Sequence, residues 1–274
     1  MNTLPFLRNL ILLLTENLLF LQCVSAQTTI LAVRASNGII IASDSLQKVI
    51  IPSTGVGVPE KSVRQSVCKI YQFGNIFYAT SGSLLSNPKT GFIGDKVIAK
   101  AFQKDKDIAD NVDRFGNELQ DPLKEAIENV KIEYPDYFEQ NIFNHEPVQL
   151  LIAGIENGVP ILMTRGFKVA SSLGEPVRIE INKQGCKEPT CQQDHPFYIA
   201  LGKHDALDRY VDNNPNIWSP GITDDAVRRL VEVEIADKPE DVGPPVDILF
   251  VGINQMQWIQ KKPGCPTKHY GIAD

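Results

Sequence analysis

The sequence predicts an α+β protein in which two antiparallel sheets pack face to face with helices outside them. Three hairpin patterns, and the helical patterns between them, support this prediction. Each hairpin pattern is a pair of apolar runs separated by asparagine and glycine, which tolerate the positive φ of tight turns. The paired runs are residues 28–35 and 39–43, residues 68–73 and 76–80, and residues 148–155 and 159–164. Because such hairpins join antiparallel strands, we expect antiparallel pairing throughout each sheet.

Helical patterns fill the intervals between the hairpins. Asp121 followed by Pro122 predicts a helix start, because proline fits the first helical position. Thr223 is expected to cap another helix, and residues 93–102 and 205–211 have further amphipathic patterns. A late buried strand is predicted for residues 246–251. No linker divides the chain after the N-terminal segment, so we expect one domain over 27–260, preceded by segment 1–26 and followed by a C-terminal tail, 261–274.

Length and charge narrow the classes of function. The chain has 274 residues, of which 43% are hydrophobic and 22% are charged, the balance of a globular protein with an ample core. Its formal net charge is −6, and it has no long run of lysine or arginine. Nucleic acid and anionic membrane surfaces are therefore not expected as partners.

Residues 1–26 have the pattern of a signal peptide. Arg8 precedes an apolar run, and small residues end the segment at Ser25-Ala26, although Glu16 interrupts the apolar region. An N-terminal helix or a pro-segment is the alternative. Glu16 also leaves no run of about 20 apolar residues, so a membrane-spanning anchor is not favoured. We therefore expect a secreted or periplasmic protein with no membrane attachment once the signal is removed.

The cysteines fit an oxidising compartment. Removal of Cys23 with the signal leaves four cysteines, an even number. They are Cys68, Cys186, Cys191 and Cys265. A local disulfide between Cys186 and Cys191 is one possible pairing, and the sequence leaves the pairing open. Cys186, Cys191 and His195 match no strong zinc spacing, so no metal or other cofactor is expected.

The stretch SAQTTILAV joins the segment 1–26 to the first predicted strand and offers Thr28 as a nucleophile. A threonine at the start of a chain can attack an amide, because its α-amine, with a pKa of about 7.7–8.0, can take the hydroxyl proton. A nearby lysine would favour negative charge on the oxygen, and a carboxylate would keep that lysine charged. A glycine N–H could receive the oxyanion. Asp44, Lys69 and Gly82, each at or near the end of a predicted strand, are candidates for these roles.

The spacing of these residues resembles that of the proteasome β-type subunits, which are N-terminal nucleophile hydrolases. TTILAVRASNGIIIASDS is similar to their opening hairpin, with Thr28 as nucleophile and Asp44 at the acidic position. SVCKIYQFGNIFYATSG is similar to their next segment, which places Lys69 as the catalytic lysine and Gly82 as the oxyanion glycine. The resemblance continues through QLLIAGIENGVPILMTRG, FYIALGKHDALDRY and VDILFVG, and so spans most of residues 28–254. It implies an exported member of that family.

This resemblance carries expectations about fold, reaction and assembly. It implies a four-layer αββα sandwich, self-cleavage before Thr28, threonine peptidase chemistry on a peptide or small amide, and homo-oligomers or rings. Three positions depart from the family pattern. Gln27 stands where the family has glycine, and Lys203 stands where it has a serine near the nucleophile's amine. Asp241 is the candidate for the aspartate before the last long strand, whose companion serine is missing. The alternative function is therefore a non-catalytic subunit or binding protein that kept the fold.

Overall fold

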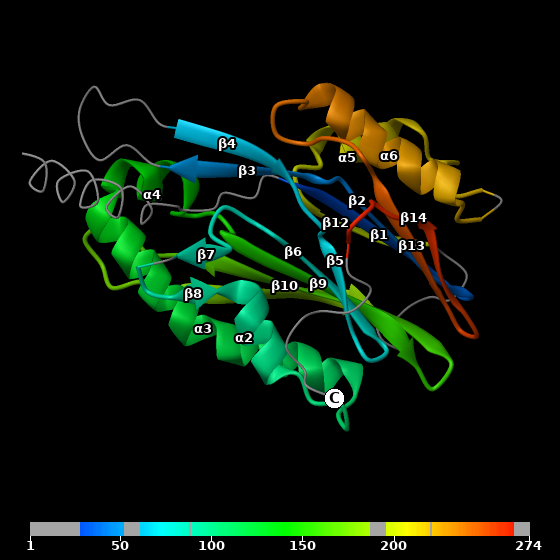
Figure 1. Ribbon diagram of the computed structural model, residues 1–274, viewed down its shortest axis with the longest axis horizontal. Helices are drawn as coiled ribbons and strands as arrows, with labels where there is room; N and C mark the ends of the chain where they lie inside the picture. Colours follow the sequence, from blue (N-terminus) through cyan, green and yellow to red (C-terminus); the bar gives the residue numbers. More distant parts are fainter. Residues whose placement is uncertain (1–27, 52–60, 88, 187–195, 220, 266–274) are drawn as a thin grey trace, which may run out of the picture.

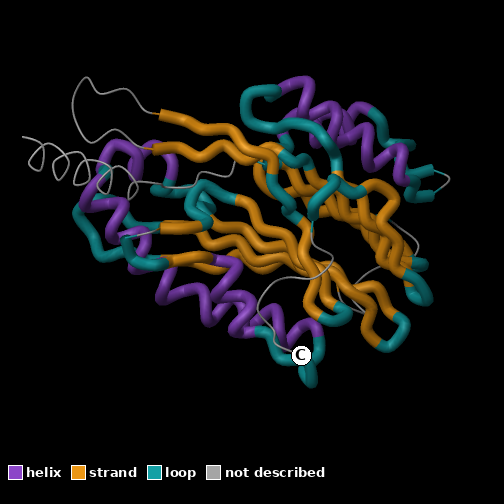
Figure 2. The backbone as a smooth tube through the Cα atoms, viewed as in Figure 1, coloured by secondary structure: helices purple, strands orange, loops and turns teal. Residues whose placement is uncertain are grey.

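The computed structural model describes residues 28–51, 61–87, 89–186, 196–219 and 221–265, in which two five-stranded sheets form the centre and helices lie outside them (Figures 1 and 2). Segment 1–26, Gln27, Cys191, His195 and the end of the tail lie outside the described residues. The strands within each sheet are antiparallel, so the predicted α+β class with antiparallel sheets is confirmed. No helix among the described residues is long and apolar enough to span a membrane.

The first sheet carries the start of the described chain on one of its inner strands. Its order is β12 (Phe197–Gly202), β1 (Thr29–Ala35), β2 (Gly38–Ser43), β13 (Asp247–Gly252) and β14 (Met256–Gln260). Every neighbouring pair in this sheet is antiparallel. The register sets Thr29 opposite Gly202 on one side, and Ser43 opposite Asp247 on the other. The start of β1 therefore lies beside the ends of β2 and β12, at one end of the sheet.

The second sheet packs against the first. Its order is β11 (Ile179–Cys186), β10 (Val159–Val169), β9 (Val148–Glu156), β6 (Ile76–Ser81) and β5 (Ile70–Phe73). An apolar cluster between the two sheets contains Ile30 and Ala32 from β1 together with Ala79 from β6 and Leu151 from β9. Side chains alternate along a strand, so Leu31 and Val33 point to the opposite face of β1.

Helices cover the outer face of each sheet. Beside the second sheet lie α2 (Gly94–Ala101), α3 (Ile108–Glu133) and α4 (Pro135–Asn141), which share a core cluster with that sheet. Leu31 and Val33 of the first sheet pack with α5 (Asp205–Asn213) and α6 (Asp224–Asp237). Figure 1 shows the two groups of helices on opposite sides of the paired sheets. Three apolar clusters thus lie between the layers: one between α2–α4 and the second sheet, one between the two sheets, and one between the first sheet and α5–α6.

The predicted hairpins and most of the predicted helices are present. β1–β2, β5–β6 and β9–β10 are the three hairpins. The Thr223 side chain caps α6 by accepting a hydrogen bond from the Ala226 N–H at 3.1 Å. The predicted start at Asp121–Pro122 is wrong, because α3 begins at Ile108 and Pro122 lies inside it. Proline removes one helical hydrogen bond, but α3 buries an apolar face on both sides of Pro122, at Leu119 and Leu123, and this burial outweighs the loss.

A two-stranded ribbon occupies the interval between the first two hairpins, for which the sequence analysis predicts no strand. It consists of β3 (Leu46–Ile51) and β4 (Lys61–Ser66), which pair with each other in a sheet of their own. Figure 1 shows the ribbon extending beyond the main sheets. A second small sheet pairs β7 (Ser86–Asn87) with β8 (Phe92–Ile93). The ribbon begins two residues after Asp44 and ends three residues before Lys69, so its base lies at the candidate site.

Candidate active site

Thr28 lies immediately before β1 and is held there by the end of β12. Its carbonyl accepts a hydrogen bond from the Lys203 N–H at 2.7 Å. The next residue, Thr29, donates its hydroxyl to the Lys203 carbonyl at 2.5 Å. Both threonines are fully buried. These contacts fix the backbone at Thr28 through the neighbouring strand, so the position of its side chain follows from the sheet register.

The Thr28 hydroxyl and the Lys69 ammonium meet at one oxygen of Asp44. Thr28 Oγ1 donates to Asp44 Oδ1 at 2.7 Å, and Lys69 Nζ donates to the same atom at 2.5 Å. Asp44 follows the end of β2, and Lys69 immediately precedes β5 in the opposite sheet. The structure therefore brings together three of the residues that the sequence singled out, although they come from separate strands.

Asp44 is a buried carboxylate whose two oxygens are fully engaged. Oδ1 also accepts from the Thr29 N–H at 2.9 Å, and Oδ2 accepts from the N–H groups of Leu46 at 3.0 Å and Gly243 at 3.1 Å. The carboxylate is 0% exposed. Hydrogen bonds to a charged carboxylate offset part of the cost of burying it. Asp44 is thereby fixed in one orientation by backbone amides from three parts of the chain.

Lys69 is almost as deeply buried as its partner. Its side chain is 5% exposed, and Nζ donates to the Leu46 carbonyl at 2.5 Å as well as to Asp44. Burial lowers the pKa of the Lys69 ammonium from its ordinary value of 10.5, and the charge and hydrogen bond of Asp44 oppose that change. A positive charge close to the Thr28 hydroxyl would favour the alkoxide, because opposite charges attract strongly where water is excluded.

Two glycines let the backbone of the opposing sheets approach the site. Gly202 has φ +77°, and a β-carbon there would lie 1.9 Å from the Thr28 carbonyl oxygen. Gly82 has φ +140°, and a β-carbon there would lie 2.1 Å from the Pro147 carbonyl oxygen. Any other residue would clash at both positions. Gly82, the predicted oxyanion residue, thus follows the end of β6 at a point where only glycine fits.

A cavity of about 590 Å³ adjoins these glycines. Ser81, Gly82 and Ser83 line one part of it, and Gly202 and Lys203 line another. The remaining lining side chains are polar or charged and come from the end of α4, the loop after it, and strands β9, β10 and β11. We call this space the polar cavity. It places a solvent-accessible space next to the residues that hold Thr28.

Ser81 is a site residue that the sequence reasoning missed. Ser81 is one of the residues that line the polar cavity, its side chain is fully buried, and its Oγ has no hydrogen-bond partner within the described chain. A β-carbon on Gly202 would lie 2.6 Å from this oxygen, so the hydroxyl sits beside the strand end that holds Thr28. Buried hydroxyls are nearly always hydrogen-bonded, so an unpaired one next to a nucleophile is available to a substrate or a water molecule. Its position directly before Gly82 was the available sequence signal.

Asp241 occupies a different position from the other predicted residues. It forms an ion pair with Lys48 of β3 at 3.4 Å, with side chains 12% and 21% exposed. Two residues after Asp241, the backbone N–H of Gly243 contacts the site by donating a hydrogen bond to Asp44. The structure therefore places Asp241 beside Lys48 near the base of the ribbon.

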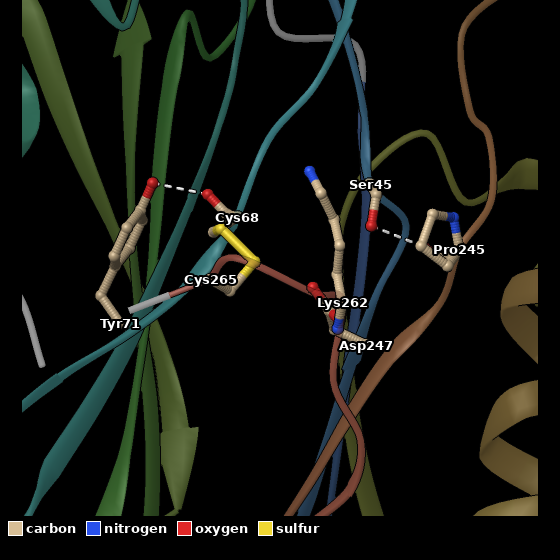
Figure 3. Close-up of a disulfide and its surroundings, with 7 residues drawn as sticks. All are labelled: Ser45, Cys68, Tyr71, Pro245, Asp247, Lys262 and Cys265. Carbon is tan, nitrogen blue, oxygen red and sulfur yellow. Dashed lines mark hydrogen bonds between the residues drawn. A yellow bond between two sulfur atoms is a disulfide. The ribbon is translucent and has the colours of Figure 1, made fainter. Parts of the chain in front are cut away.

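A disulfide lies directly beside Lys69. Cys68 is bonded to Cys265, which comes after the last strand of the first sheet. Figure 3 shows the bond with its surroundings, including the Tyr71 hydroxyl that donates to the Cys68 carbonyl at 2.5 Å. The disulfide resolves the pairing of two cysteines that the sequence left open, while the suggested Cys186–Cys191 bond reaches outside the described residues. It ties the segment after β14 to the strand that carries the lysine.

No group of three or more histidine, cysteine, aspartate or glutamate side chains gathers into a potential metal site within the described ranges. The groups that meet around Thr28 are a hydroxyl, an ammonium, a carboxylate and backbone amides. These groups suit nucleophilic attack on a carbonyl, in which negative charge develops on oxygen.

Comparisons with known proteins find similarity only among solved structures. No family model and no curated protein matches the chain. One similar structure is an Anbu (Gly-1) mutant from Hyphomicrobium sp. strain MC1, with 12% identity, a TM-score of 0.47, and coverage of 86% of this chain and 89% of that chain. Another is Anbu (ancestral beta-subunit) from Yersinia bercovieri, with 15% identity, a TM-score of 0.46, and coverage of 85% and 88%.

The prediction of an exported proteasome β-type subunit is therefore wrong. The similar structures are Anbu proteins, a family distinct from those subunits, and no family model or curated protein supports the predicted membership. The resemblance rested on short strand and turn motifs, which do not separate one family from another. At these identities and TM-scores the similarities assign the chain to no family, and no argument about its chemistry follows from them.

Proposed function

We propose that the protein is a threonine-type N-terminal nucleophile hydrolase that cleaves amide bonds through Thr28. One observation carries the proposal: the Thr28 hydroxyl and the Lys69 ammonium both donate to Asp44 Oδ1, in a site from which solvent is excluded. A buried lysine–aspartate pair is costly to form, so its position against a buried threonine hydroxyl is hard to explain by stability alone. The order of helices, sheet, sheet and helices supports the four-layer αββα arrangement as part of the same proposal.

The proposed reaction begins when the Thr28 α-amine takes the hydroxyl proton while Oγ1 attacks the carbonyl carbon of the substrate. A C–O bond forms, and the electron pair of the carbonyl moves onto its oxygen, next to the Gly82 N–H. Lys69 stabilises the developing charge, and Asp44 holds Lys69. Collapse of this intermediate breaks the C–N bond, and the α-ammonium gives its proton to the leaving nitrogen. Water then hydrolyses the Thr28 ester to a carboxylic acid and the free hydroxyl.

This reaction requires hydrolysis of the Gln27–Thr28 bond, because an amide nitrogen cannot act as the base. In the full chain the Thr28 hydroxyl already bonds to Asp44, so the nucleophile is oriented before the bond is cut. The remaining sequence expectations belong to the proposal as well. They are export directed by residues 1–26, a single domain over 27–260, a peptide or small amide substrate, and assembly into homo-oligomers or rings.

A non-catalytic protein is the second candidate, and one observation favours it. Thr28 has no exposed surface in the full chain, so a substrate cannot reach its hydroxyl in that state. If the chain is never cut before Thr28, the site would hold the two sheets together without chemistry. Both candidates share the same described structure and differ in the state of a single peptide bond.

The N-terminus of the purified protein and its reaction with a peptide epoxyketone distinguish the two candidates. This probe reacts with a hydroxyl and an α-amine on the same residue. We expect the mass of the intact protein to equal that of a chain that begins at Thr28, and we expect one probe molecule to be bound to that residue. Thr28→Ala should abolish labelling, whereas Thr29→Ser, a matched change that keeps the hydroxyl bonded to Lys203, should retain it. An intact Gln27–Thr28 bond in a protein that does not react would establish the non-catalytic alternative.

A further inference from the structure

The polar cavity has a charge pattern that neither the nucleophile nor its activation explains. Lys203 lines the cavity directly after β12, and its own N–H donates to the Thr28 carbonyl. Lys168 lines the cavity from β10 in the opposite sheet. Two cations from different sheets therefore border one space beside Thr28.

Among the described residues, neither lysine has a partner for its charge. Both side chains are half-buried, and neither Lys168 nor Lys203 makes an ion pair or a side-chain hydrogen bond with any residue that the structure describes. Other lysines near this region are paired: Lys183 on β11 lies 3.0 Å from Asp113, and Lys131 lies 3.7 Å from Glu128. Charges that border a restricted cavity interact more strongly with a bound anion than charges in open water do.

The anionic residue of the cavity lining is already engaged. Glu146 accepts a hydrogen bond from Gln149 Nε2 at 2.8 Å on one oxygen, and from Asn182 Nδ2 at 2.5 Å on the other. Gln149 in turn accepts from the Gly202 N–H at 2.9 Å, which links this network to the strand end beside Thr28. Glu146 is thus held by neutral amides rather than by either lysine. Together with the two lysines it leaves the charged lining with a net positive charge.

We propose that the polar cavity binds a carboxylate of the substrate through Lys203 and Lys168, an inference that rests on the proposed hydrolase function. The cavity is lined by Lys203, whose N–H holds the Thr28 carbonyl, and by Gly82, the proposed oxyanion residue, so a carboxylate bound there would lie close to the bond that is cut. The preferred substrate is an acidic amide or peptide. The carboxylate comes either from an acidic side chain or from the free C-terminus of a short leaving group.

Matched peptides test this assignment and separate the two sources of the carboxylate. Each peptide carries Glu or Gln at one position near the scissile bond, with its C-terminus either free or amidated. We expect kcat/KM to be about tenfold to a hundredfold higher for the acidic member of one pair, the range for a hydrogen bond to a charged group. Preference in the Glu/Gln pair indicates a side-chain carboxylate, and preference in the free/amidated pair indicates a terminal one. Equal rates within both pairs would overturn the inference.

Substitution of the two lysines tests whether the preference for acidic peptides comes from the polar cavity. Lys203→Met and Lys168→Met keep the length of the side chain and remove its charge, and each should reduce the ratio of acidic to neutral rates. Lys183→Met is the control, because Lys183 lies on β11 beside the cavity residue Asn182 but pairs with Asp113. This control should keep the full ratio. An unchanged ratio in both cavity variants would mean that these lysines are ordinary solvated side chains.

A binding measurement separates failure of this inference from failure of the proposed function. Thr28→Ala protein lacks the nucleophile but keeps the polar cavity, so peptide affinity can be measured without turnover. The variant is produced with residue 28 as its first residue, because it cannot carry out the expected self-cleavage before that residue. Tighter binding of the acidic peptide that weakens in Thr28→Ala/Lys203→Met supports the cavity even if no peptide is cleaved. Cleavage of neutral and acidic peptides at equal rates supports the hydrolase and overturns the cavity.

Discussion

Lys69 Nζ lies 2.5 Å from Asp44 Oδ1, and neither side chain is more than 5% exposed. An ion pair in this setting has lost most of its hydration, which costs several kcal/mol for each ion. The mutual attraction and the added bonds to Leu46, Thr29 and Gly243 offset that cost. Each partner therefore depends on the other, and removal of one leaves an uncompensated charge in the interior.

This dependence predicts strong coupling in a double-mutant cycle. Asp44→Asn should lower the free energy of unfolding by about 3–5 kcal/mol, because it leaves the Lys69 ammonium buried without a counter-charge. The double variant Asp44→Asn/Lys69→Met should be destabilised by about 2 kcal/mol less than the sum of the single changes. Urea unfolding of the four proteins measures this difference. Additive effects would contradict the coupling.

The lowered pKa of Lys69 predicts opposite responses of activity and stability to alkaline pH. Activity that needs the ammonium should be lost as pH rises through the folded-state pKa, below the value of 10.5 for an ordinary lysine. Between these two pKa values the unfolded chain binds more protons than the folded one, so the free energy of unfolding attributable to Lys69 should rise with pH. Rate profiles and urea titrations of wild type and Lys69→Met from neutral pH to 10.5 test both signs.

The unpaired hydroxyl of Ser81 predicts a split between stability and activity. Ser81→Ala removes a buried hydroxyl that has no described partner, so the free energy of unfolding should stay within about 1 kcal/mol of wild type, or rise. The rate of amide hydrolysis should fall about tenfold or more, because Ser81 is one of the residues that line the polar cavity and directly precedes Gly82, the proposed oxyanion residue. Ser43→Ala is the control, since Ser43 Oγ is also buried and unpaired but does not line the polar cavity. Equal activity of both variants would assign Ser81 no role.

The disulfide predicts a redox-dependent stability. Cys68 and Cys265 are separated by 197 residues, so their bond restricts a large part of the unfolded chain. Reduction, or the double change Cys68→Ser/Cys265→Ser, should lower the free energy of unfolding by about 2–5 kcal/mol. Thermal unfolding with and without reductant measures this. The double variant should not respond to reductant, and a response would indicate a second bond.

The sequence predicted those parts of the molecule that depend on local patterns. Asn37-Gly38 gave the first hairpin, and the register of that hairpin carries Thr28 to the end of β2, where Asp44 lies. Lys69 could be placed by its position ahead of the next apolar strand. Contacts between distant parts of the chain could not be predicted in the same way. The Gly243 amide reaches Asp44 from 199 residues away, and nothing near either residue signals that contact.

Long-range contacts also explain where the structure differs from the sequence expectations. Asp241 was a candidate for the site by spacing, and the structure pairs it with Lys48 of β3, in a ribbon for which the sequence analysis predicted no strand. Pro122 carried a strong local signal for a helix start. The buried face of α3 extends far to either side of it, and tertiary packing overrode that signal. Family membership failed for a related reason, because short strand motifs describe local geometry rather than descent.

The β3–β4 ribbon lies between Asp44 and Lys69 in the sequence, and the ion pair of these two residues joins the two ends of the ribbon. The N–H of Leu46, the first ribbon residue, donates to Asp44, and its carbonyl accepts from Lys69 Nζ, so the start of the ribbon is fixed to the ion pair. The entropy of closing a loop grows only slowly with its length once the ends are fixed. A change in the length of the ribbon would consequently cost little free energy, provided that the contacts of Leu46 with Asp44 and Lys69 are kept.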